Sequence, residues 1–485
     1  MEDNRRIVLI NPPAEVWGEG TRRLRPILNT LPQIGIASLA AVLRREGLET
    51  SIIDAQALGM TQKEVITWVI RQKPAVVGLT GYTSSVNSAA AIAEGLKQAI
   101  PDVVTVIGGP HVTAVPEKTM MIFPHFDYGL IGEGERSAPL LFRTVVGGED
   151  PRDIGGVVRR QGDAVWVKER PPLIDDLDTI PPPAFDLLPG FPKSYHPPIF
   201  HTPKGRAITL VTSRGCPYHC TFCDRGIFGN RYRFHSVGYI VDMIRRLRDT
   251  HGIEHFIFYD DNFTADKSHL AGLCEAIMRL PFRITFACDA RADHVDQQML
   301  ALMKRAGAWM ISYGIETANE ELLRLLDKSL SLERAARAVR LTKEAGIIAK
   351  GLFMIGIPGE TAQTIERTKA FIGELPFDLI NLSKFTPYPG SEIYRNISQY
   401  GDFEDDWKNM SGMNFVFRPN TIDPGVLKRE SDAILADFYR KPSRMKNIVR
   451  KTMNRRDAGR LFQALFLKVT GAVMDVFSTN GKRAE

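Results

Sequence analysis

Residues 213–225 read Ser-Arg-Gly-Cys-Pro-Tyr-His-Cys-Thr-Phe-Cys-Asp-Arg and hold three of the five cysteines of the chain, Cys216, Cys220 and Cys223. This C-x3-C-x2-C spacing follows a strand-like run over 207–212, so we expect the cysteines on a loop at the carboxyl end of that strand. Thiolates are the usual ligands of iron–sulfur clusters and structural zinc. A closed site needs four protein ligands, and no fourth cysteine lies nearby. The spacing therefore favours a four-iron cluster with one iron left open for a substrate or cofactor.

A zinc site is the alternative interpretation of the same cysteines, with His219 or His235 as the fourth ligand. Zinc sites usually pair C-x2-C or C-x4-C with a second couple of ligands, which this chain lacks. A non-catalytic iron–sulfur carrier is a further alternative. The missing fourth ligand argues against it, because a carrier has no use for an open iron.

Outward from the cysteines, strand-like and helical stretches alternate from residue 206 to about 395. The strands are predicted at 207–212, 255–259, 283–288, 309–314, 349–355 and 379–384. Six such units in about 180 residues suit a partial (β/α)6 barrel of the TIM type, since a complete barrel takes about 250. Active sites of these barrels lie at the carboxyl ends of the strands, where the cysteine loop is also expected.

The first 145 residues show a second alternating pattern. Strands are predicted at 7–10, 50–53, 75–80, 103–107 and 128–131, and helices at 34–46, 62–72 and 88–99. Strands this apolar, separated by helices, indicate a parallel sheet covered on both faces. The fold class is therefore α/β, with an N-terminal doubly wound, Rossmann-like domain that binds its ligand beyond the carboxyl ends of its strands.

The remaining segments complete a prediction of four regions. Residues 146–205 contain a hairpin pattern at 154–161 and 164–169 and then many prolines, which indicates a linker. Residues 396–485 read as a helical C-terminal region. The predicted regions are thus 1–145, 146–205, 206–395 and 396–485.

Composition narrows the class of protein. With 485 residues, 44% hydrophobic and 24% charged, the chain has the make-up of a folded globular protein. No run of about 18 apolar residues predicts a membrane-spanning helix. The N-terminus lacks the features of a signal peptide, and the cysteines are odd in number and clustered, so we expect a cytoplasmic protein with metal or redox chemistry.

The C-terminal segment is strongly basic. Residues 440–460 hold nine Lys or Arg and one acidic residue, and the apolar run 461–467 follows. Such a segment can be a solvated helix face, or it can touch an acidic membrane surface or nucleic acid. Without interleaved aromatic residues we expect no nucleic-acid partner. A peripheral membrane contact through 440–475 stays open.

The cysteine motif, with Phe222 before its last cysteine, resembles the signature of radical S-adenosylmethionine (SAM) enzymes. Further strand-end motifs agree with this resemblance, at 259–264, 314–317, 356–361 and 387–391. It implies that Cys216, Cys220 and Cys223 hold a [4Fe–4S] cluster whose open iron binds SAM. Reductive cleavage would then give a 5′-deoxyadenosyl radical. Further SAM contacts implied by the resemblance are Phe222 to the adenine, Arg291 to the methionyl carboxylate, Glu316 to the ribose or amino group, and Asp260 at the mouth.

The N-terminal domain resembles the cobalamin-binding domain found in part of this superfamily. The matching loops are 80–85, 108–113, 116–117 and 132–135. Glycines would let the backbone approach a flat ring, and hydroxyls would bind its amides and nucleotide tail. The residues implied in cobalamin binding are Thr80, Thr83, Ser84, Gly108, Gly109, His111, Gly132 and Glu133. The D-x-H-x-x-G motif is absent, because the first strand is followed by Asn11-Pro12-Pro13-Ala14, so no cobalt-ligating histidine is expected there.

This domain order resembles the cobalamin-dependent radical SAM class, which includes methyltransferases and the anaerobic oxidative cyclase of magnesium-protoporphyrin monomethyl ester. The resemblance favours methyl transfer to an unactivated carbon of a small molecule or of a lipid- or tetrapyrrole-like substrate. Oxidative cyclisation or rearrangement is the alternative. An electron donor such as flavodoxin or ferredoxin is the implied protein partner.

Overall fold

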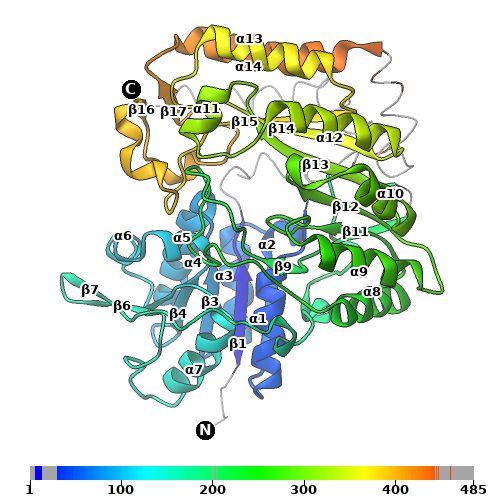
Figure 1. Ribbon diagram of the computed structural model, residues 1–485. Coiled ribbons are helices and arrows are strands. Elements are labelled where there is room, and N and C mark those ends of the chain that lie inside the picture. The colour runs from blue at the N-terminus through cyan, green and yellow to red at the C-terminus, as the bar shows by residue number, and fades with distance from the viewer. Residues whose placement is uncertain are drawn as a thin grey trace.

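The computed structural model describes residues 6–13, 30–198, 201–203, 205–442, 444, 446 and 459. In Figure 1 the N-terminal domain, coloured blue to cyan, lies below the green and yellow barrel. The C-terminal segment, in orange, returns to contact both parts. None of the described helices combines the length and the apolar character that crossing a membrane requires.

The N-terminal domain is built on a seven-stranded sheet in the order β2-β1-β3-β4-β5-β6-β7. The first five strands in this order are parallel, as predicted, and they lie at the five places where the sequence predicted strands. The strands are β1 (Ile7–Asn11), β2 (Thr50–Asp54), β3 (Val76–Thr80), β4 (Val104–Gly108), β5 (Tyr128–Leu130), β6 (Val157–Gln161) and β7 (Ala164–Val167).

Helices cover both faces of this sheet, which confirms the doubly wound prediction. Helices α1 (Ile34–Arg45) and α7 (Gly134–Val146) pack on one face, where Leu9 and Val106 are buried. The other face carries α3 (Gln62–Gln72), α4 (Val86–Ala99), α5 (Pro110–Ala114) and α6 (Pro116–Ile122), and the four-residue helix α2 (Ala55–Leu58) follows β2. Helix α7 was not predicted, although its first residues belong to the Gly-Glu-Gly-Glu motif.

Residues 146–205 do more than connect two domains. The predicted hairpin forms as β6 and β7 and extends the N-terminal sheet in antiparallel fashion beyond β5. The proline-rich part that follows has two short 3₁₀ turns, η4 (Leu177–Thr179) and η5 (Phe185–Leu187), and packs on α1 through a hydrophobic cluster that includes Val42 and Leu177.

The second domain is an open barrel of six parallel strands in the order β15-β14-β13-β12-β11-β8, as predicted. The strands are β8 (Arg206–Leu210), β11 (Ile253–Phe258), β12 (Thr285–Ala290), β13 (Ala308–Glu316), β14 (Ile348–Ile355) and β15 (Leu379–Lys384). The helices between them are α8 (Val237–His251), α9 (Lys267–Met278), α10 (Gln297–Ala306), α11 (Glu320–Leu325), α12 (Leu332–Glu344) and α13 (Ala362–Glu374), with the 3₁₀ turn η6 (Ala292–His294) after β12.

Side chains of the barrel strands alternate between the helix-facing core and the barrel interior. The helix-facing set includes Phe258, Phe286 and Ile311. A separate cluster fills one end of the interior with Ile257, Ala287, Met310, Ile348 and Leu379, one residue from each of five neighbouring strands. Because the side-chain period of a strand is two, the residues two positions after Ala287, Met310 and Ile348 also face the interior.

The C-terminal region is helical only in part. Strands β16 (Gly401–Phe403) and β17 (Phe417–Pro419) form an antiparallel pair, flanked by 3₁₀ helices η7 (Ile393–Gln399) and η8 (Trp407–Asn409), and one long helix, α14 (Pro424–Arg440), follows. Trp407 contacts the N-terminal domain, with its ring 4.3 Å from that of His111. Most of the basic–apolar tail, for which a solvated helix face and a membrane contact were the alternatives, lies outside the described residues.

Candidate functional site

A cavity of about 710 Å³ lies between the two domains. It opens between the carboxyl edge of the N-terminal sheet and the mouth of the barrel, the two places where the sequence predicted ligand binding. Its volume is within the range of small-molecule sites. On the side of the N-terminal domain, the lining residues include Thr80, Tyr82, Gly108, Gly109, Gly132, Glu133 and Glu135. On the side of the barrel, they include Thr209, Val211, Arg214, Cys216, Cys223, Tyr259 and Asp261.

The cysteine loop is held at its base by two short paired strands, β9 (Ser213–Arg214) and β10 (Arg233–Phe234). Gly215 begins the loop with φ of 86°, and a Cβ atom at this position would lie 2.2 Å from the carbonyl oxygen of Arg231. Glycine is therefore required at the point where the two stems come together. The loop brings Cys216 and Cys223 to the cavity wall, while Cys220 is buried behind them.

The three thiols form a donor set suited to an iron–sulfur cluster. All are free cysteines, and burial raises the pKa of each, that of Cys223 to about 12, so the thiols release protons when they bind metal. In the described part of the chain, no three His, Cys, Asp or Glu side chains are placed to hold a single metal ion. A four-iron cluster instead takes a different iron at each cysteine, and this loop offers three soft ligands beside a cavity.

The histidines considered as zinc ligands have other partners. Arg225 and Asn230 contact Nδ1 of His219 at 2.9 and 3.1 Å, and His219 is exposed. His235 lies 3.1 Å from a carboxylate oxygen of Asp178 and stacks on Tyr239. The two other cysteines, Cys274 and Cys288, are buried in the helix-facing core, away from the loop.

Two neighbouring aspartates fasten the cysteine loop to the end of β11. The carboxylate of Asp260 accepts hydrogen bonds from the backbone and hydroxyl of Thr212 at 2.6 and 2.5 Å, and from the backbone of Ser213 at 3.2 Å. Asp261 accepts one from the backbone of Gly215 at 2.9 Å. Asp260 is 4% exposed and does not line the cavity, whereas Asp261 does. The structure thus places Asp260 as a residue that positions the loop.

Replacing Asp260 by asparagine is expected to remove a pH dependence of stability. Burial raises the pKa of Asp260 from 3.8 to about 6, against the hydrogen bonds from Thr212 and Ser213 that lower it. Between these two pH values the folded chain keeps a proton that the unfolded chain has released, so the free energy of unfolding falls as the pH rises. The expected fall is about 3 kcal/mol.

Urea denaturation of wild type and D260N at about pH 4 and about pH 7 measures this effect, because other titrating groups cancel in the difference between the two proteins. The wild type should lose stability relative to D260N on going to the higher pH. A difference that is the same at both pH values would contradict the assignment.

The residues predicted to contact SAM lie around the cysteine loop but have partners of their own. Arg291 stacks on Tyr218, with its guanidinium 3.6 Å from the ring centroid, and donates through Nε and Nη2 to Asp293 and through Nη2 to the Ser329 carbonyl. The bidentate edge of its fork is thus occupied. Phe222 is partly buried and packs with Lys328 near its ring.

Glu316 has an unusual backbone. Its φ is +70°, in the left-handed region that residues other than glycine rarely adopt. The Glu316 carboxylate accepts a 2.6 Å hydrogen bond from Lys328. Such strain costs on the order of 1–3 kcal/mol and is found mainly at functional sites. The backbone conformation is a second reason to regard Glu316 as a candidate functional residue. The sequence had indicated Glu316 only by its place at the end of a strand.

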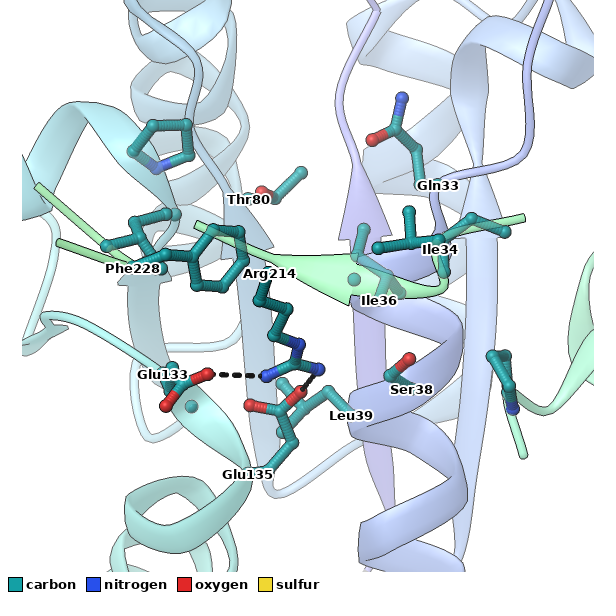
Figure 2. A pocket seen from close by; sticks show the side chains of 18 of the residues that line it. Gln33, Ile34, Ile36, Ser38, Leu39, Thr80, Glu133, Glu135, Arg214 and Phe228 are labelled. Atoms are coloured by element: carbon teal, nitrogen blue, oxygen red, sulfur yellow. Dashed lines mark hydrogen bonds and ion pairs between the residues drawn. The ribbon is translucent and has the colours of Figure 1, made fainter. Parts of the chain in front are cut away.

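A buried group of four charges connects the cysteine loop to the N-terminal domain. Arg214 donates to Glu133 at 2.8 Å and to Glu135 at 2.5 Å, as Figure 2 shows beside helix α1. Arg233 donates to both oxygens of Glu133 at 3.0 Å. Since Arg214 and Arg233 are cross-strand partners in β9 and β10, both stems of the loop are attached to one carboxylate. We call this group the Glu133 clamp.

The linker joins the same clamp. The backbone nitrogen of Ile174 donates to Glu133 at 2.8 Å, and its carbonyl accepts from Arg233 at 2.6 Å. Glu133 was predicted as a cobalamin contact, and it does line the cavity. Its arginine partners were missed, because no local signal in the sequence relates the Gly-Glu-Gly-Glu motif to residues in another domain.

On the N-terminal side, the cavity wall is made of glycine-rich strand ends. Thr80, Gly108, Gly109 and Gly132, all predicted from the sequence, line it. Gly109 has φ of 102°, and a Cβ atom there would lie 2.9 Å from the Thr80 hydroxyl. The backbone is thus exposed at this edge, as close approach of a flat ligand requires.

The cavity also extends between the sheet and helix α1. Leu9 and Gly78 line it from the strands, and Ser38 and Leu39 line it from the helix. A Cβ atom on Gly78 would meet Leu9 at 2.8 Å, so this strand position has no room for a side chain. A broad glycine-lined edge with an extension into the domain fits cobalamin, a flat ring with a long nucleotide tail.

Three predicted cobalamin residues do not line this cavity. Thr83 is buried, Ser84 is partly buried, and His111 is fully buried beneath Trp407. The Nδ1 atom of His111 lies 3.2 Å from the Thr83 hydroxyl, and burial lowers the pKa of His111 to about 4. The ring of His111 contacts Trp407 of the C-terminal segment, and the 3₁₀ turn η3 (Thr83–Ser85) packs against η8.

Comparison with known proteins agrees with the geometry of the site. Residues 210–372 match the family model of the Radical SAM superfamily, and residues 23–142 match that of the B12 binding domain. An uncharacterised methyltransferase of Pyrococcus horikoshii is 32% identical over 390 residues, which cover 80% of this chain and 82% of the relative. The anaerobic magnesium-protoporphyrin IX monomethyl ester cyclase of Rubrivivax gelatinosus is 27% identical over 85% of this chain and 74% of its own.

A solved structure shows the same fold. The radical SAM methyltransferase TsrM from Kitasatospora setae, with cobalamin and a [4Fe–4S] cluster bound, superposes with a TM-score of 0.67 at 20% identity, over 82% of this chain and 75% of its own. The chain belongs to the cobalamin-binding radical SAM superfamily. It is thus a radical SAM enzyme rather than a non-catalytic iron–sulfur or zinc protein.

Proposed function

We propose that this enzyme is a cobalamin-dependent methyltransferase that acts on an unactivated carbon of a small molecule. One observation carries the proposal: a single cavity is lined by Cys216 and Cys223 of the barrel and by the glycine-rich strand ends of the B12-binding domain. A cluster bound by the cysteines and a cobalamin bound at the glycine-rich strand ends would therefore face the same cavity. When bound, the [4Fe–4S] cluster supplies the electron that cleaves SAM to a 5′-deoxyadenosyl radical, and cobalamin supplies the methyl group.

Different residues of the chain would bind the cluster and cobalamin. Cys216, Cys220 and Cys223 would hold the cluster, with Asp260 and Asp261 fixing their loop. Thr80, Gly108, Gly109, Gly132 and Glu133 would hold cobalamin at the sheet edge. We retain Thr83, Ser84 and His111 as supports of that edge, because they lie behind it.

SAM would lie at the open iron. Phe222 would contact its adenine, and Glu316 with Lys328 its ribose or amino group. The Nε and Nη2 atoms of Arg291 already donate hydrogen bonds to Asp293 and to the Ser329 carbonyl. The methionyl carboxylate would therefore bind at Nη1. An electron donor of the flavodoxin or ferredoxin kind would reduce the cluster in the cytoplasm.

Oxidative cyclisation is the second candidate, since one relative is a cyclase. Anaerobic reconstitution with iron, sulfide and cobalamin, followed by SAM, a reductant and a metabolite extract, separates the two candidates by mass spectrometry. A product heavier by one methylene unit than its precursor supports methyl transfer. A product that has lost hydrogens or gained oxygen would replace it with the cyclase proposal, and absence of 5′-deoxyadenosine would reject both.

A further inference from the structure

The barrel interior carries a belt of polar side chains directly above its apolar end. These residues are Tyr259, Asp289, Ser312, Lys350 and Asn381, and each stands two positions after a member of the apolar cluster Ile257, Ala287, Met310, Ile348 and Leu379. Because strand side chains alternate, Asp289, Ser312 and Lys350 face the interior. Tyr259 follows the last residue of β11, and Asn381 is exposed on the edge strand β15. A barrel interior filled only for stability would continue with apolar layers. We call these five residues the polar belt.

Strand register places the charged members of the polar belt in a row. Asp289 on β12 is opposite Ser312 on β13, which is opposite Lys350 on β14. Neighbouring strands are about 4.8 Å apart, so the Cα atoms of Asp289 and Lys350 are separated by roughly 10 Å, with one hydroxyl side chain between them.

The two charges of the polar belt do not neutralise each other by direct contact. Within the described part of the chain they form no ion pair, although each influences the pKa of the other. The Nζ atom of Lys350 instead lies 2.7 Å from Nε2 of His201. Both charged residues are only partly buried. Charges that are partly removed from water and have no direct counter-ion are costly, and a ligand with complementary charges lowers that cost.

One member of the polar belt, Tyr259, lines the cavity between the domains. Two residues from the neighbouring strand β8 and its end also line the cavity. Thr209 lies on β8, and Val211 is the first residue after it. Tyr259 is 54% exposed at the mouth of the barrel. The hydroxyl of Thr209 is buried and has no hydrogen-bond partner among the described residues. An unpartnered hydroxyl at the cavity wall is a feature that a bound polar ligand completes.

We propose that the polar belt binds the substrate through a zwitterionic group, with an ammonium of the substrate at Asp289 and a carboxylate at Lys350. This assignment rests on the proposed function, because it takes the barrel interior as the substrate site of that reaction. An α-amino acid carries its ammonium and its carboxylate on the same carbon atom, and it fits a gap of one strand between a carboxylate and a flexible lysine. It replaces the lipid- or tetrapyrrole-like substrate that the resemblance also allowed.

The test uses the full-length, reconstituted enzyme and a metabolite extract divided into three parts: zwitterionic solutes retained on both cation and anion exchangers, solutes that are only anionic, and an organic-solvent extract. The variants are D289N and K350M, and K63M on the exposed surface of α3 is the matched control. We expect the methylated product to form from the zwitterionic fraction. Without reductant, that fraction should raise the Tm of the wild type and of K63M but not of D289N or K350M.

The apparent KM for the active fraction should rise at least tenfold in D289N and K350M and stay unchanged in K63M. Formation of 5′-deoxyadenosine without substrate should be equal in all four proteins, which shows that the variants fold and hold the cluster and SAM. Product from the anionic or organic fraction, or an unchanged KM in both belt variants, would overturn the zwitterion proposal. Loss of 5′-deoxyadenosine in the wild type would instead reject the proposed function.

Discussion

Serine in place of Cys220 is expected to leave anaerobically purified protein almost free of iron and acid-labile sulfide, and to lower 5′-deoxyadenosine formation more than about 100-fold, because loss of a direct ligand exceeds the effect of losing a supporting contact. A hydroxyl is a hard donor that rarely loses its proton, whereas iron in a sulfide cluster prefers thiolate. Cys220 is buried within the loop.

The matched control for this variant is Cys274→Ala. Cys274 is also a buried free thiol, but it lies on α9 in the helix-facing core. Iron content, the absorption of the cluster and 5′-deoxyadenosine formation should stay at wild-type values in C274A. If C220S retained its iron, or if the wild type carried zinc when prepared without oxygen, the cluster assignment would be wrong.

The variant E133Q is expected to lose about 3–5 kcal/mol of unfolding free energy, since it breaks the Glu133 clamp and leaves Arg214 and Arg233 buried with a single carboxylate between them. Its side chain is 5% exposed, so solvent cannot replace the lost charge. Because the clamp holds both stems of the cysteine loop, hydrogen exchange over 213–234 should accelerate more than elsewhere in the barrel.

Asp175 provides a close control for the clamp. It pairs with Arg231 at 2.7 Å and thus joins the same linker to the same loop, but both side chains are mostly exposed. D175N should change the free energy of unfolding by less than about 0.5 kcal/mol, as is usual for exposed ion pairs. Denaturant unfolding and hydrogen exchange of the two variants measure the contrast. Equal effects in E133Q and D175N would show that the clamp does not fix the loop.

Patterns that repeat along the chain were sufficient to predict the two sheets. The eleven parallel strands occur at the predicted places because apolar runs of this length, separated by helical periodicity, have few alternatives. The C-terminal region was less predictable. Strands β16 and β17 are three residues each and pair only with each other, so they leave no periodic signal. Helix α7 was missed because it begins inside a motif of glycines and glutamates.

The candidate site was predictable where it depends on local spacing and not where it depends on distant partners. Cys216, Cys220 and Cys223 could be assigned from their separation alone. The position of Arg214 could not, because its partner Glu133 is 81 residues earlier. His111 was singled out as a lone histidine near glycines, yet a tryptophan from the other end of the chain covers it. The Asp289–Lys350 row likewise appears only once strand register is known.

The contact of Trp407 with the N-terminal domain sets a requirement for making this protein in pieces. The ring fills a hydrophobic cluster with Val86 and Met410 and lies below the ammonium of Lys118, which pairs with Asp405. A fragment that stops before residue 400 would expose Val86 and the His111 ring to water. Attempts to isolate the cobalamin-binding half for titration should therefore keep the 394–416 segment, supplied as a separate peptide or fused through a short connector.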